Sequence, residues 1–159
     1  MVSAWSGPAR RARPAATCCH LARLAVGRQQ VLDRADATAP RLVAVLTEAS
    51  LMYRWGSQQD RRAQVAHLAA MSRRRSVEVR LLRFADGPHP GMISPFNIFD
   101  FPDDEDLSIV YLENDFGIDE VTKADEVEAY KQTFARIRDA ALAPAATRNY
   151  LDTLSQTQE

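Results

Sequence analysis

Residues 41–83 contain the pattern that most constrains the fold: two apolar segments separated by one amphipathic segment. The first, RLVAVLT (41–47), is a short apolar run typical of a strand that is buried on both faces. The last, VEVRLLR (77–83), alternates apolar with charged residues, which is typical of a half-exposed strand. A strand, a helix and a strand in succession predict a right-handed crossover unit in which the two strands lie parallel.

The segment between these strands has the features of a capped helix. Ser57 is followed three residues later by Asp60, which predicts a capping box with Asp in place of Glu and a helix over about 58–74. Apolar and small residues recur along it at helical spacing, so we expect one face to be buried: Val65, Leu68, Ala69 and Ser72.

The second half of the chain predicts a hairpin followed by helices. Residues 85–95 are dense in Gly and Pro and predict a loop. Two strands, 96–101 and 107–113, flank a short polar turn and read as a hairpin. Thr122 and Asp125 can cap a helix, whose apolar stripe is Val127, Tyr130, Phe134, Ile137 and Ala141. Pro144 suits the first turn of a last helix, with Tyr150, Leu151 and Leu154 on its buried side.

Together these segments predict an α+β fold. The strand–helix–strand unit and the hairpin would form a small mixed sheet, and the C-terminal helices would pack on it. Residues 1–26 mix Pro, Ala and Arg without a sustained period, so we expect an irregular, disordered tail there. Residues 27–159 then form a single domain, which is the usual outcome for a chain of 159 residues.

Charge is distributed unevenly along the chain although the net charge is −1. Residues 1–83 hold 15 Arg against five acidic residues, and residues 84–159 hold five basic against 16 acidic residues. This asymmetry is typical either of a nucleic-acid face with an acidic partner face, or of two halves that attract each other in the fold. No apolar run is long enough to span a membrane, and no secretory signal is visible, so cytoplasm is the expected compartment.

Candidate chemical motifs are weak. Cys18, Cys19 and His20 are metal-ligand types, but adjacent ligands without a second cluster do not suit zinc, so we expect no metal and no cofactor. His89 lies near Asp86 and could act as a base, yet no nucleophile signature accompanies it. We therefore expect a protein that is not an enzyme, with a small hydrolase using His89 as a remaining alternative.

Five arginines around the helix of residues 58–74 could neutralise phosphates: Arg61, Arg62, Arg73, Arg74 and Arg75. No helix-turn-helix pair, zinc finger or aromatic RNA-binding sheet accompanies them. Arginines at 73–75 also suit a helix C-terminus, where the helix dipole favours positive charge. DNA binding through this Arg-rich half remains an alternative, and it predicts an affinity that falls steeply with salt.

The order of segments resembles the C-terminal domain of the Scr-type antitoxin-like transcriptional regulators. The segments that carry the resemblance are GRQQVLDR (27–34), RLVAVLTEASLMYRW (41–55), QVAHL (64–68), VEVRLLRFADGPHPGMISPFNIFDFP (77–102) and IVYLE (109–113). Members of that family carry a helix-turn-helix domain before this one, and the chain has 26 irregular residues in its place. After Glu113 the chain also departs from the family, reading NDFGIDEVT.

The resemblance implies a regulatory interaction domain from a toxin–antitoxin-like system. Its partner would be a small, toxin-like protein, usually encoded nearby, or a second copy of the chain, and DNA would be engaged only indirectly through full-length relatives. A truncated remnant without activity of its own is a further alternative. We expect the interaction residues in the loop after residue 84 and at strand ends, because loops on a rigid scaffold carry recognition: Glu48, Gly87, His89, Pro90, Gly91, Phe96 and Glu113.

Overall fold

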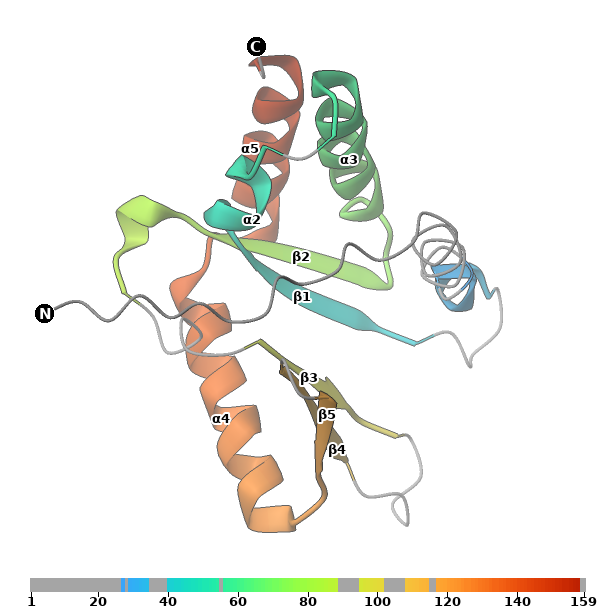
Figure 1. Ribbon diagram of the computed structural model, residues 1–159, viewed down its shortest axis with the longest axis vertical. Helices are drawn as coiled ribbons and strands as arrows, with labels where there is room; N and C mark the ends of the chain where they lie inside the picture. The colour runs from blue at the N-terminus through green and yellow to red at the C-terminus, as the bar shows by residue number, and fades with distance from the viewer. Residues whose placement is uncertain are drawn as a thin grey trace, which may run out of the picture. The chain divides into compact units, whose positions relative to one another are not determined.

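The computed structural model consists of two units, residues 1–41 and residues 42–159. It describes residues 27, 29–34, 40–54, 56–88, 95–101, 108–114 and 117–157. In the first unit, the described residues contain one short 3-10 helix, η1 (Gln30–Asp33). The predicted irregular tail, residues 1–26, lies outside the described residues. The second unit holds the strands and helices discussed below (Figure 1).

The strand–helix–strand prediction is confirmed. Strand β1 (Leu42–Thr47) pairs in parallel with β2 (Val77–Leu82), with Leu42 opposite Val77 and Thr47 opposite Leu82. The connection holds two helices, the predicted α3 (Gln58–Met71) and a short α2 (Glu48–Met52) that the sequence did not reveal. The prediction that β1 is buried on both faces is wrong. Its residues are half-buried and Leu42 is exposed, because β1 has a strand neighbour on only one side among the described strands.

Helix α3 begins as the sequence predicted. The Ser57 hydroxyl accepts a hydrogen bond from the Asp60 N–H at 3.1 Å, and the Asp60 carboxylate accepts one from the Ser57 N–H at 2.8 Å. This reciprocal pair satisfies two backbone groups that a helix start otherwise leaves without partners. Val65, Ala69 and Ser72 are buried on one face, and Leu68 packs against the same core. The predicted buried face of α3 is therefore confirmed.

The α+β class is confirmed, and the strands form two sheets. The hairpin exists as β3 (Phe96–Phe99) and β4 (Ile109–Asn114), which pair antiparallel with Phe96 opposite Leu112. It does not join β1 and β2 in one mixed sheet, which corrects that part of the prediction. Instead β4 pairs on its other side with β5 (Gly117–Val121), an unpredicted strand, so the described strands form a parallel pair and a separate antiparallel trio.

Two C-terminal helices complete the unit: α4 (Ala124–Ala140) and α5 (Pro144–Thr157). Pro144 opens α5 as predicted, and the predicted apolar stripe of α4 is buried or half-buried. The predicted cap by Thr122 is wrong. Helix α4 begins one residue too late for it, so Lys123 occupies the cap position and makes no side-chain capping bond.

The parallel pair lies between helices on both faces (Figure 1). On one face, α3 and α5 pack around Leu51, Val65, Ala69, Leu81 and Leu151. On the other face, Ile137 and Ala141 at the C-terminal end of α4 pack with Leu82, and Val45 and Phe96 lie against this cluster. The antiparallel sheet covers the N-terminal part of α4, where the Phe96 ring meets the Tyr130 ring edge-on at 5.2 Å between centroids. Within the described residues, no helix combines the length and the apolar character needed to cross a membrane.

A candidate interaction groove along strand β1

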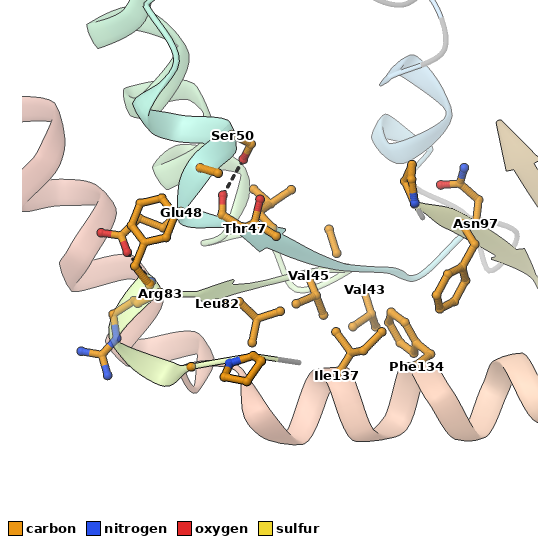
Figure 2. A pocket seen from close by; sticks show the side chains of 18 of the residues that line it. Val43, Val45, Thr47, Glu48, Ser50, Leu82, Arg83, Asn97, Phe134 and Ile137 are labelled. Carbon is orange, nitrogen blue, oxygen red and sulfur yellow. Dashed lines mark hydrogen bonds between the residues drawn. The ribbon is translucent and has the colours of Figure 1, made fainter. Parts of the chain in front are cut away.

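A groove of about 960 Å³ runs along β1 on the side where α4 and the start of β3 lie (Figure 2). All six residues of β1 line it, while β2 contributes only Leu82. Figure 2 shows Val43, Val45 and Leu82 pointing toward Phe134 and Ile137 of α4. The remaining lining residues come from the start of α2, the segment after β2 and the start of β3: Glu48, Ala49, Ser50, Arg83, Phe84, Gly87, Pro88, Pro95, Phe96 and Asn97.

Every second residue of β1 directs its backbone N–H and C=O groups toward the groove. The Leu42 N–H donates to the Ser76 carbonyl at 2.8 Å, so Leu42 faces β2. In a parallel strand, every second residue bonds to the same neighbour, and the residues between them present their N–H and C=O groups to the opposite side. Val43 and Val45 therefore direct these groups away from β2. No partner strand for that side of β1 is present among the described residues.

The opposite edge of the pair is partly covered. The Leu81 carbonyl points away from β1 and accepts a hydrogen bond from the Leu142 N–H at 2.9 Å, in the connection between α4 and α5. The two edges of the parallel pair therefore differ. The β2 edge is bridged by the chain itself, while the described part of the chain leaves the β1 edge accessible beside an apolar groove.

Glu48 closes one end of the groove by joining three elements. One carboxylate oxygen, Oε2, accepts a hydrogen bond from the Phe84 N–H at 2.6 Å, and the other, Oε1, accepts one from the Tyr150 hydroxyl at 2.5 Å. These bonds tie the start of α2 to the 3-10 turn η2 (Phe84–Asp86) and to α5. Since both oxygens are engaged, Glu48 holds the groove in shape rather than offering a free acid.

Charges around this junction are also paired. Arg83 Nη2 donates to Asp86 Oδ1 at 2.6 Å, and this contact lowers the pKa of Asp86. Burial raises the pKa of Tyr150 to about 12, and the hydrogen bond to the neighbouring Glu48 carboxylate adds to the effect. Both effects favour the neutral phenol, so Tyr150 is a hydrogen-bond donor at ordinary pH.

A comparison with known sequence families assigns the chain to a family. A family model described as a domain of unknown function (DUF5753) matches residues 2–153. The chain belongs to the DUF5753 family. No curated protein and no solved structure matches it. The match spans both units, so residues 2–26 are part of the DUF5753 region although they lie outside the described residues.

Three of the predicted interaction residues lie at the groove of this DUF5753 chain. Glu48 and Phe96 both line it, and Gly87 lines it beyond η2 with a positive φ of 79° that favours glycine. Glu113 lies within β4, in the other sheet, and its side chain is exposed. The remaining three, His89, Pro90 and Gly91, lie outside the described residues.

Several of the arginines proposed as phosphate contacts have partners within the fold. Nη2 of Arg73 donates to both carboxylate oxygens of Asp152 in α5, at 2.8 and 2.7 Å. Arg61 donates to the Gly56 carbonyl at 3.2 Å, and Arg74 donates to the Met71 sulfur at 3.8 Å. Arg62 is also engaged, and Arg75 is exposed. The Arg73–Asp152 pair is an instance of attraction between the basic and the acidic half.

Sequence reasoning missed two contributors to the site. The outward-facing backbone of Val43 and Val45 leaves no signal in residue type, because it depends on which side of β1 the second strand occupies. Tyr150 was assigned to a buried helix face, and nothing local to it indicates a bond to Glu48, 102 positions away. Among the described residues, no three His, Cys, Asp or Glu side chains lie close enough to hold a metal ion.

Proposed function

We propose that the chain is a non-enzymatic protein-interaction domain that binds an extended segment of a small protein partner along β1. The observation that carries this proposal is that, among the described residues, no strand pairs with the outward side of β1, which lies beside an apolar groove. Extended segments commonly bind by adding a strand to such an edge, where main-chain hydrogen bonds give affinity and side-chain pockets give specificity.

The length of β1 is enough to pair with one partner strand. Six residues of β1 extend over about 20 Å, and a paired strand would lie about 4.8 Å from it. The walls are mainly apolar and include Phe96 of β3 with Phe134 and Ile137 of α4. The partner segment should therefore alternate, with apolar side chains directed toward α4.

The resemblance to antitoxin-like transcriptional regulators supplies the proposed biological setting. In that setting the domain is cytoplasmic and regulatory, the partner is a small toxin-like protein, and DNA is bound only by the helix-turn-helix domain of full-length relatives. A second copy of the chain, pairing β1 with β1, is the alternative occupant of the same groove.

The test is co-purification of the full chain with the small protein encoded beside its gene. Val43→Pro removes an N–H that faces the groove and leaves the Leu42, Ala44 and Leu46 bonds to β2 in place. We expect this variant to fold and to lose the partner. Tyr53→Ala is the control, because Tyr53 is a highly exposed aromatic residue outside the groove lining and should leave binding unchanged.

Retention of the partner by a folded Val43→Pro variant would contradict the proposal, as would the absence of any complex with wild type. Light scattering of the wild-type chain distinguishes the alternative occupant. A dimer that Val43→Pro converts to a monomer would assign the groove to self-association instead of a toxin-like partner.

A further inference from the structure

The antiparallel sheet has a second exposed surface, which shares only Asn97 with the lining of the groove. Phe96 and Ile98 of β3 alternate with Asn97 and Phe99, and Phe96 packs on α4 through Tyr130 and Phe134. Because neighbouring residues in a strand point to opposite faces, Asn97 and Phe99 lie on the face away from α4. We call this the outer face of the sheet.

Strand register places apolar and aromatic side chains together on the outer face. Phe99 lies opposite Ile109, and Tyr111 of the central strand lies diagonal to Phe99, with the two rings edge-on at 5.3 Å between centroids. Ile118 of β5 completes the set. Phe99 is 50% exposed and Ile118 is 60% exposed. Large apolar side chains exposed together are typical of a surface that binds a partner.

The charges on the same face have one sign. Glu120 lies opposite Tyr111 and accepts a hydrogen bond from its hydroxyl, which raises the pKa of Tyr111. Glu113 lies opposite Ile118, and its side chain is exposed. The described residues of β3, β4 and β5 contain no Lys or Arg. The outer face is therefore an aromatic and apolar platform bordered by carboxylates.

The aromatic rings and carboxylates of the outer face indicate which kind of molecule can bind there. Aromatic sheet faces can stack nucleic-acid bases, but two carboxylates and no cation would repel the phosphates. A second copy using the same face would bring Glu113 and Glu120 of both copies together, which like-charge repulsion disfavours. An arginine side chain satisfies both features, since its planar guanidinium stacks on aromatic rings and pairs with carboxylates in a forked geometry.

We propose that the outer face binds an arginine-bearing segment of a second protein, with guanidinium groups stacked on Phe99 and Tyr111 and paired with Glu113 and Glu120. The Glu120 carboxylate has acceptor capacity beyond the bond from Tyr111. Lysine should serve less well, because a compact ammonium lacks both the stacking plane and the fork.

The test uses the full chain as bait for a random-peptide library displayed on phage, followed by affinity measurements with a synthetic copy of a selected peptide. We expect the selected peptides to be enriched in Arg. Phe99→Ala, and separately the double variant Glu113→Gln/Glu120→Gln, should each weaken binding by about fivefold or more. Replacing Arg with Lys in the peptide should weaken binding in the same direction.

Matched controls distinguish binding at the outer face from a general effect of negative charge and from binding in the groove. Glu128→Gln/Asp139→Asn removes two exposed carboxylates of α4 and should leave affinity unchanged, as should Val43→Pro. Selected peptides without Arg enrichment would overturn the proposal. So would equal binding by the double Gln variant, which keeps the size and shape of the side chains, or a preference of the outer face for a single-stranded oligonucleotide over the peptide.

Discussion

Tyr150 and Glu48 are 102 positions apart, yet the Tyr150 hydroxyl donates a 2.5 Å hydrogen bond to Glu48 Oε1. The other oxygen of the same carboxylate accepts the Phe84 N–H. One side chain at the start of α2 therefore joins α5 to the segment that leaves β2. The groove along β1 has this junction at one end, so its shape depends on contacts between residues that are distant in sequence.

The junction should contribute measurably to stability. Tyr150→Phe removes one charge-assisted hydrogen bond and should lower the free energy of unfolding by about 1 to 2 kcal/mol. Glu48→Ala removes both bonds and should cost more, since it leaves the Phe84 N–H and the Tyr150 hydroxyl without their acceptor. Urea denaturation of the two variants checks the order. A Tyr150→Phe variant as stable as wild type would show that the bond is dispensable.

Stability should also fall at alkaline pH because of Tyr150. Its pKa is raised from 10.0 to about 12, so the folded state holds the phenol proton more tightly than the unfolded state does. The resulting stabilisation is complete below pH 10 and is lost as pH rises from about 10 to about 12. Urea midpoints measured across this range should decline in wild type, and the Tyr150→Phe variant should show a smaller decline. Parallel profiles for both proteins would contradict the assignment.

The start of α3 offers an independent test of local structure. Ser57→Ala removes one half of the capping box and should cost about 1 kcal/mol. Gly56→Ala should also destabilise the chain, because Gly56 has a φ of 59° and an added Cβ would lie 3.0 Å from the Asp60 carboxylate. Thermal unfolding followed by circular dichroism measures both effects. An increase in melting temperature for Gly56→Ala would exclude this backbone conformation.

The arginines around α3 should not confer DNA binding on this chain. Arg73 is engaged by Asp152, Arg61 by Gly56, and the net charge of the chain is −1. Fluorescence anisotropy with duplex DNA should therefore show no binding that weakens steeply as salt is raised. Binding at low salt that Arg75→Ala weakens would instead support the phosphate-contact alternative.

The sequence predicted the elements whose signals are local. The Ser57–Asp60 box, the alternation of Val77 and Val79, and Pro144 at a helix start each report their own surroundings. Helix α2 has five residues, too few for a helical period to show. Strand β5 reads GIDEV, and Gly and Asp are depleted in strands, so it forms through its pairing with β4 rather than through propensity.

The candidate site was less predictable because it depends on how the strands are arranged in the two sheets. Residue types pointed to Glu48, Gly87 and Phe96, and all three line the groove. The absence of a partner for this edge of β1 among the described strands could not be predicted, since the sequence indicated one mixed sheet in which the hairpin extends the parallel pair. The separation of the hairpin into its own sheet is what leaves Val43 and Val45 beside the groove.

Amide hydrogen exchange of β1 with and without the proposed protein partner tests the central claim most directly. Strand addition predicts that the partner slows exchange of the Val43 and Val45 N–H groups, while the Leu42, Ala44 and Leu46 groups, already bonded to β2, change little. This alternation is specific to a strand that pairs with the side of β1 facing away from β2. Unchanged exchange at Val43 and Val45 in a formed complex would contradict binding along β1.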